Sequence, residues 1–159
     1  MKVVHGKGFD KLQEALNELK GRQLRVGWES SAVYPNGDVV AVVAAQNEFG
    51  NPAKHIPPRP FMRPTITNKQ TIWRDHIAKG AMSVLESKTT AVNALSTIGQ
   101  GIAGDFRKAI AQVTSPALAT ATVEARLRGK KQGKSVSLSI AKPLVDTGFM
   151  LNSLTSTVQ

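Results

Sequence analysis

Proline is concentrated in one short stretch of this chain, and that stretch limits what the chain can fold into. Four of the eight prolines among the 159 residues are Pro57, Pro58, Pro60 and Pro64. Proline fixes φ at about −65° and has no N–H to donate, so these positions exclude a helix interior or a central strand. The residue before each proline is also biased toward extended geometry. The sequence therefore predicts a stiff, extended connector.

This connector has two interpretations. It is a rigid linker between packed elements, or it is a docking arm that binds a neighbouring subunit. A stiff segment loses little conformational entropy when it is fixed against a partner, and charged and apolar side chains are interleaved along this one. The residues predicted to make subunit or ring contacts are Ile56, Pro57, Pro58, Arg59, Pro60, Phe61 and Arg63.

The segments before the connector predict a helix, a strand and a second helix. The first helix is expected over residues 9–20, where apolar residues recur at helical spacing. Alternating apolar residues predict a half-buried strand at Gln23–Trp28. The valines of residues 38–50 favour a strand by propensity, but Asp38 is a good N-cap and Gly50 a good C-terminal stop. We therefore expect a helix there.

The middle of the chain predicts two long helices. No proline occurs within Ile66–Val113, and apolar residues recur there at helical spacing. We expect an interruption at Ser87–Thr90, with one of its threonines capping the second helix. That helix contains Gly99, Gly101 and Gly104, and each glycine costs about 1 kcal/mol relative to alanine. These glycines either mark a bend or let another backbone approach closely, and we favour a close contact with another helix.

Basic residues and a turn dominate the last third of the chain. Thr120–Arg128 predicts a short helix that ends at Gly129. Residues 126–141 are expected to form a flexible basic loop. The candidates for contact with phosphate or an acidic surface are Arg126, Arg128, Lys130, Lys131 and Lys134. A C-terminal turn is then expected to aim a final strand, and its residues are Lys142, Pro143, Asp146, Thr147 and Gly148. Asp146 is interpreted as a cap of this turn or as the partner of an arginine such as Arg59.

The sequence offers no constellation for catalysis, cofactor binding or metal binding. It has no cysteine, and its three histidines are scattered, which argues against thiolate and zinc sites. Residues 146–148 match the Asp-Thr-Gly tripeptide of aspartic proteases, but that chemistry needs two aspartates that share a proton. We prefer the capping interpretation and expect a protein that is not an enzyme.

The charge of the chain indicates an acidic partner. Lysine and arginine number 21 against 11 aspartates and glutamates, a net charge of +10. Nucleic acid, an acidic protein surface and a membrane face all fit such a balance. No apolar run reaches the length of about 18 residues that a membrane span needs. With no signal-peptide core at the N-terminus, we expect a protein used in the cytoplasm or built into a particle there.

Three segments, taken in order, resemble one protein family. They are VAVVAAQNEFGNPAKHIPPRPFMRPTI at residues 40–66, SPALATATVEARLRGKK at 115–131 and KPLVDTGFMLNSLT at 142–155. These are similar to signature segments of the tail-component, or virion-morphogenesis, proteins of long-tailed bacteriophages, of the tail-completion or minor tail protein Z type. Phe149-Met150-Leu151 departs from the family pattern, which more usually has a basic residue and leucine after the Asp-Thr-Gly turn.

The resemblance implies a structural protein of the virion neck or tail. Such proteins complete the tail or join it to the head by forming a ring, often a hexamer, between the tail tube and the head connector. The implied partners are further copies of the chain, the tail tube or terminator protein, the connector proteins and DNA in the lumen, with no membrane. The implied location is the virion, after assembly in the host cytoplasm.

The resemblance also implies an α+β fold over a single domain, residues 1–159. A small antiparallel sheet would be flanked by long helices, with the proline-rich segment as an extended connector. The residue patterns agree, because they predict one sheet from Gln23–Trp28 and the chain end plus a helical middle. Two alternatives stay open: a tail terminator ring protein, and a small basic protein that binds nucleic acid through its basic region.

Overall fold

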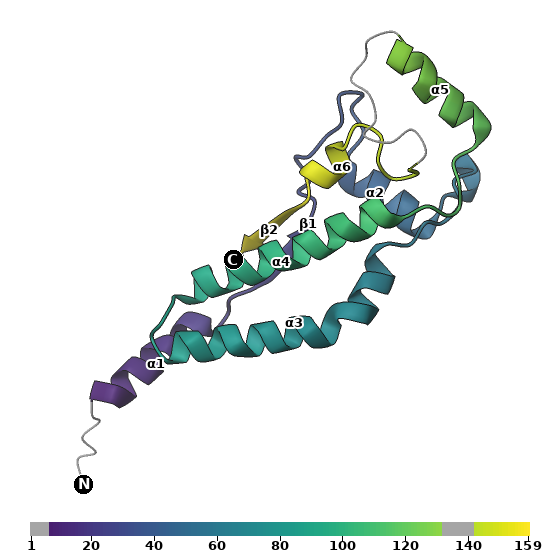
Figure 1. Cartoon of the computed structure of the whole chain (residues 1–159). Helices are drawn as coiled ribbons and strands as arrows, with labels where there is room; N and C mark the ends of the chain where they lie inside the picture. Colours follow the sequence, from purple (N-terminus) through teal and green to yellow (C-terminus); the bar gives the residue numbers. More distant parts are fainter. Residues whose placement is uncertain (1–6, 132–141) are drawn as a thin grey trace. The chain divides into compact units, whose positions relative to one another are not determined.

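The computed structural model describes residues 7–131 and 142–159 and has the expected α+β fold. The predicted helices and strands are all present, with small shifts at their ends. In chain order the elements are α1 (Lys7–Leu19), β1 (Leu24–Gly27), α2 (Val40–Phe49), the 3₁₀ helix η1 (Pro52–Lys54), α3 (Met62–Leu85), α4 (Ala91–Gln112), α5 (Thr120–Lys131), α6 (Phe149–Asn152) and β2 (Thr155–Val158) (Figure 1).

The chain, for which a single domain is expected, divides into two compact units. Unit 1 is built from the described residues of Met1–Val26, Lys69–Ile102 and Ser156–Gln159. Unit 2 is built from Gly27–Asn68 and from the described residues of Ala103–Thr155. The long helices α3 and α4 each contribute residues to both units.

The sheet joins two segments from opposite ends of the sequence. β1 pairs with β2, and the Gln23 N–H donates to the Gln159 carbonyl at 2.8 Å while the Gln159 N–H donates back at 2.9 Å. The side chains of this small sheet lie directly on α4 at Gly99. A Cβ at Gly99 would come within 2.6 Å of Leu24 Cδ1 and 2.8 Å of Ser156 Cβ. The sheet therefore needs a glycine at this position of the helix.

The helix–helix contact predicted at the α4 glycines is wrong. Gly99 meets side chains of the strands, and nothing lies within 4 Å of a Cβ built at Gly101 or Gly104. The close helix approach occurs at Gly80 of α3 instead, where a Cβ would lie 2.9 Å from Ile98 Cδ1 of α4. A single glycine inside a helical pattern is only weak evidence of a close contact, so the sequence does not predict the contact at Gly80.

Unit 1 has a small core between α1 and the α3–α4 corner. Ala15, Val84 and Ala91 are buried together. The Glu18 carboxylate accepts a hydrogen bond from the Ala91 N–H at 2.8 Å, and Thr90 Oγ1 accepts one from the N–H three residues later at 3.2 Å. The predicted threonine cap is confirmed, and a carboxylate from another helix satisfies a second N–H at the start of α4.

Unit 2 has the larger core. Its buried residues are Val40, Ala44, Phe61, Ile110, Leu144, Val145 and Met150. Trp28 closes one side, with its ring edge-on to Phe61 at 6.1 Å and its indole N–H donating to the Met150 carbonyl at 2.8 Å. Segments far apart in the sequence therefore share one core around α2.

Asp38 does not cap α2. Val39 occupies the N-cap position and makes no side-chain hydrogen bond to the helix. The chain before α2 is held extended by an antiparallel bridge between Val33 and Val39, which places Asp38 one residue too early. Its carboxylate accepts instead from Asn36 Nδ2 at 2.8 Å. Gly50 ends α2 as expected, with φ at 79°.

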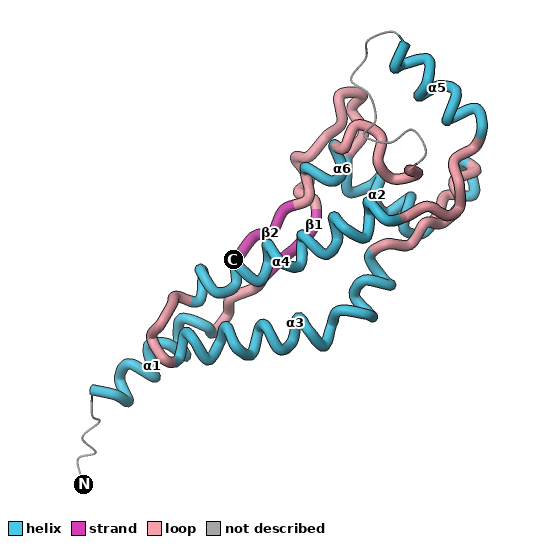
Figure 2. Tube along the Cα trace, in the orientation of Figure 1, coloured by secondary structure: helices cyan, strands magenta, loops and turns pink. Residues whose placement is uncertain are grey.

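The basic region is more helical than predicted. α5 continues to Lys131 and does not stop at Gly129, so residues 126–131 are helix and not flexible loop. Residues 132–141, which include Lys134, lie outside the described residues. The segment between α2 and α3, by contrast, is irregular apart from η1, as the prolines require (Figure 2).

Candidate functional site

Glu48, near the end of α2, holds the start of α3. Its Oε2 accepts from the backbone N–H groups of Phe61 and Met62 at 2.7 and 2.9 Å. Its Oε1 accepts from the Arg63 N–H at 3.1 Å and from Arg63 Nε at 3.0 Å. The first N–H groups of a helix have no partner within the helix, and a negative charge there also complements the helix dipole. Glu48 supplies both in one side chain that is only 2% exposed.

These contacts decide the protonation state of Glu48. Burial by itself raises the pKa of this carboxyl group. The hydrogen bonds from three backbone N–H groups and the Arg63 side chain act in the opposite direction and together outweigh it. The pKa of Glu48 therefore lies below its usual range, and the group is ionised in the folded protein.

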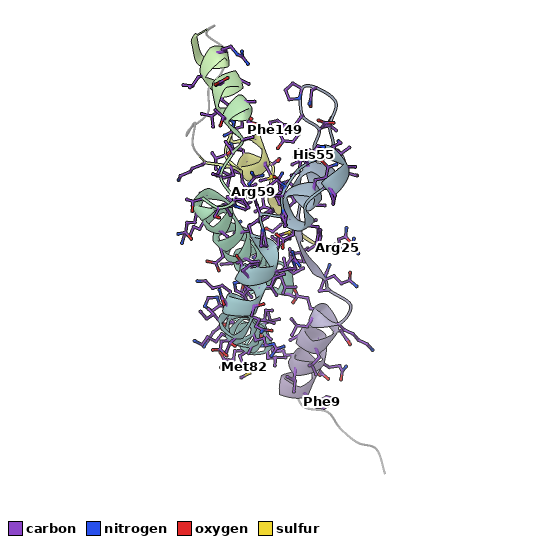
Figure 3. The ribbon with its side chains drawn as sticks, turned by 90° about the vertical axis from the view of Figure 1, so that its right-hand side faces the viewer. Phe9, Arg25, His55, Arg59, Met82 and Phe149 are labelled. Atoms are coloured by element: carbon purple, nitrogen blue, oxygen red, sulfur yellow. The ribbon has the colours of Figure 1, made fainter. Side chains whose placement is uncertain are left out.

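Arg59 turns inward from the proline connector. It is 6% exposed, its Nε donates to the Pro116 carbonyl at 2.8 Å, and its Nη2 donates to the Ala117 carbonyl at 3.1 Å (Figure 3). Burial, and then the nearby positive charge of Arg126, lower the pKa of Arg59. Phe61 is also only 2% exposed and belongs to the core of unit 2. The predicted docking role of Arg59 and Phe61 is therefore corrected, because both side chains are occupied within their own chain.

The other predicted contact residues remain accessible. Pro57, Pro58, Pro60 and Arg63 are exposed, and Ile56 is half-buried. Exposed and buried positions alternate here because Arg59 and Phe61 point to the core while the prolines between and before them point out.

Two apolar residues that the sequence reasoning missed extend this exposed surface. Val42 and Phe49, seven residues apart on α2, are 53% and 65% exposed. The Arg63 guanidinium lies 4.8 Å from the centre of the Phe49 ring, and a Cβ on Gly50 would lie 3.0 Å from Pro58 Cδ. We call Val42, Phe49, Pro58 and Arg63 the α2–connector surface. The sequence does indicate this surface, because α2 has apolar residues on all sides and only one side of a helix can face the core.

A second arginine organises the C-terminal turn. Arg126 Nη1 donates to the Lys142 carbonyl at 2.9 Å, and Arg126 Nε lies 3.3 Å from Asp146 Oδ1. Asp146 thus has an arginine partner, as predicted, but the partner is Arg126 and not Arg59. Thr147 Oγ1 accepts from the Phe149 N–H at 3.3 Å, and Gly148 has a φ of 75° that favours glycine.

The structure describes the five basic candidates to different extents. Arg126 is used inside unit 2, which corrects its predicted contact with phosphate or an acidic partner. Arg128 is exposed. Lys130 and Lys131 lie in the last turn of α5, and Lys134 lies outside the described residues.

The two arginines connect three segments that are far apart in the sequence, residues 40–66, 115–131 and 142–155. Arg59, from residues 40–66, binds carbonyls of residues 115–131, and Arg126, from that second segment, binds residues 142–155. All of these contacts lie within unit 2. Sequence reasoning identified the segments, but it did not identify the contacts that join them.

Two kinds of feature are not found in the part of the chain that the structure describes. No group of three or more histidines and carboxylates there is arranged to hold a metal ion. Neither is any of its helices long and apolar enough to cross a membrane. Comparison with protein-family models, with curated proteins and with solved structures finds no match for this chain.

Proposed function

We propose that this chain is a structural protein of the neck or tail of a long-tailed bacteriophage. It performs no catalysis, completes the tail or joins it to the head, and acts as a homo-oligomeric ring between the tail tube and the head connector. Its partners are further copies of itself, the terminator or tail tube protein and the connector proteins, and DNA passes through the lumen. It is made in the host cytoplasm and ends in the virion.

The network that joins the three signature segments is the observation that carries this proposal. Each segment alone is a weak match, because short motifs recur by chance. Arg59 and Arg126 tie the three segments together in one compact unit through half-buried hydrogen bonds. Residues that match the family pattern therefore have linked structural roles, and this linkage is what supports the proposal.

The α2–connector surface is the part of the molecule best suited to ring contacts. It combines exposed apolar side chains with one arginine, Arg63, whose carboxylate partner Glu48 is buried beneath it and accepts hydrogen bonds from the start of α3. Exposed apolar area of this kind characterises protein interfaces. The proline connector beside it is stiff, so little entropy is lost when a partner binds.

The experiment is removal of the gene from the parent phage, followed by electron microscopy of the lysate. We expect separate full heads and tails, and joined particles on complementation with the intact chain. Electron microscopy of the purified protein should show rings. Normal joined particles without the chain would reject the proposal. A defect confined to tail length, with normal joining, would assign the chain to the terminator ring.

A further inference from the structure

Unit 2 contains a cavity that none of the contacts above explains. It has a volume of about 310 Å³ and opens beside the C-terminal turn. The turn before α2, α2 itself, α5 and the start of α6 all contribute to its walls. Its polar lining residues are Tyr34, Asn36, Asp38, Asn47, Arg126, Asp146 and Thr147.

The cavity carries negative charge in a basic protein. Arg126 offsets Asp146, at 3.3 Å. Asp38 accepts from Asn36 Nδ2 at 2.8 Å, and within residues 7–131 and 142–159 no lysine or arginine pairs with it. Burial raises the pKa of Tyr34, and the charges of Asp146 and Asp38 raise it further. One carboxylate of the cavity is therefore left without a cation.

The remaining walls are apolar and aromatic. The rings of Tyr34 and Phe149 lie 5.0 Å apart at an angle of 38°. The rest of the lining is Val43, Pro143, Leu144, Gly148 and Met150. A small anion is disfavoured because it would be repelled by the unpaired carboxylate of Asp38. A purely apolar ligand is disfavoured because it would cover this carboxylate without pairing its charge. A long aliphatic stem that ends in a cation satisfies both parts, because the stem covers apolar surface and the charge meets Asp38 and the aromatic ring faces.

We propose that this cavity is a socket for a lysine or arginine side chain of a second copy of this chain. This inference rests on the ring proposed above and deepens it. Charge complementarity selects the occupant: each copy carries 21 lysines and arginines against 11 acidic residues, so a neighbouring copy presents an excess of cations to the socket. Such pairing also lowers the repulsion between copies that each carry a charge of +10.

The chemistry of the socket is tested with small probes on the full chain. Amide NMR shifts are recorded while N-acetyl-L-arginine amide, N-acetyl-L-lysine amide or the neutral N-acetyl-L-norleucine amide is added. We expect the two cationic probes to shift the signals of Tyr34, Asp38 and Phe149, and the neutral probe to leave them unchanged. Asp38→Asn should weaken binding about fivefold, as expected for loss of one partly exposed charge pair. Glu29→Gln, an exposed carboxylate outside the cavity, is the matched control.

The occupant is tested by sedimentation over a range of protein concentrations. We expect Asp38→Asn to shift self-association to several-fold higher concentration, and Glu29→Gln to leave it unchanged. Equal binding of charged and neutral probes overturns the socket. Cation binding together with self-association that Asp38→Asn does not alter overturns the second copy as the occupant. The NMR and sedimentation measurements do not use phage particles. A failure of the socket proposal can therefore be told apart from a failure of the phage-joining experiment.

Discussion

At the scale of single residues, charged side chains in unit 2 replace backbone partners that the irregular connector cannot supply. Glu48 satisfies N–H groups at the start of α3, and Arg59 satisfies two carbonyls of the segment before α5. Buried charges are tolerated when every polar atom has a partner, and removal of one member leaves the others unsatisfied. These residues are therefore sensitive to changes that preserve shape but alter charge.

Glu48→Gln tests this at one carboxylate. We expect a loss of about 1–3 kcal/mol in the free energy of unfolding at pH 7. The neutral amide oxygen accepts weaker hydrogen bonds than the carboxylate does, and the NH₂ group of glutamine would face N–H donors and could not accept from them. The measurement is urea unfolding, with Glu29→Gln as the exposed control.

The same residue predicts a pH dependence. Because the folded-state pKa of Glu48 is lowered, its stabilising effect is fully present above the unfolded-state pKa and is lost as pH falls through the folded-state value. The difference in stability between wild type and Glu48→Gln should therefore shrink on acidification below the usual glutamate range. A difference that stays constant down to pH 3 would mean that the charge of Glu48 has no role.

At the scale of elements, glycines in helices differ according to what lies opposite them. Gly99 of α4 faces Leu24 and Ser156 of the sheet, whereas Gly101, two residues later, faces open space. The helix itself is the same at both positions, so the pair separates packing from helix propensity.

Alanine at these two positions should change stability in opposite directions. Gly99→Ala should destabilise the protein by about 1–3 kcal/mol, because the added methyl group overpacks the contact between α4 and the strands. Gly101→Ala should stabilise it by about 0.5–1 kcal/mol through helix propensity alone. Thermal unfolding of both variants checks this. Equal effects would show that the sheet does not constrain Gly99.

At the scale of the whole molecule, apolar side chains remain exposed well beyond α2. Among the large hydrophobic residues that are exposed are Leu12 and Leu16 of α1, Ile72, Ile77 and Met82 of α3, and Val42 and Phe49 of α2. Helix α3 is 24 residues long, and Val84 is its buried residue. This distribution is expected of a subunit that buries further surface on assembly.

Aspartate substitutions on the α2–connector surface test the docking role. Val42→Asp and Phe49→Asp should leave the melting temperature of the monomer within a few degrees, because both side chains are mostly exposed. They should abolish ring formation in electron microscopy and complementation of head–tail joining. Leu127→Asp, at an exposed leucine of α5, is the matched control. Rings formed normally by both α2 variants would place the interface elsewhere.

Local patterns in the sequence were enough to predict the helices and the two strands, in agreement with the α+β class that the resemblance implies. Helical spacing, strand alternation and the effects of proline and glycine on the backbone act within a few residues, so they can be read from the chain alone. The same patterns identified the proline connector and the C-terminal turn. They also predicted that Asp146 has an arginine partner, although they named the wrong arginine.

Only the tertiary structure decided which residues of those segments face inward. Arg59 and Phe61 lie in the core while the neighbouring prolines are exposed. Arg126 binds the C-terminal turn, although the basic composition of residues 126–141 predicted that it lies in a flexible loop. Gly99 contacts strands from both ends of the chain. These outcomes depend on contacts between residues that are distant in sequence, and such contacts exist only once the elements have packed. Periodicity and propensity cannot report them, because they measure each segment against its own neighbours.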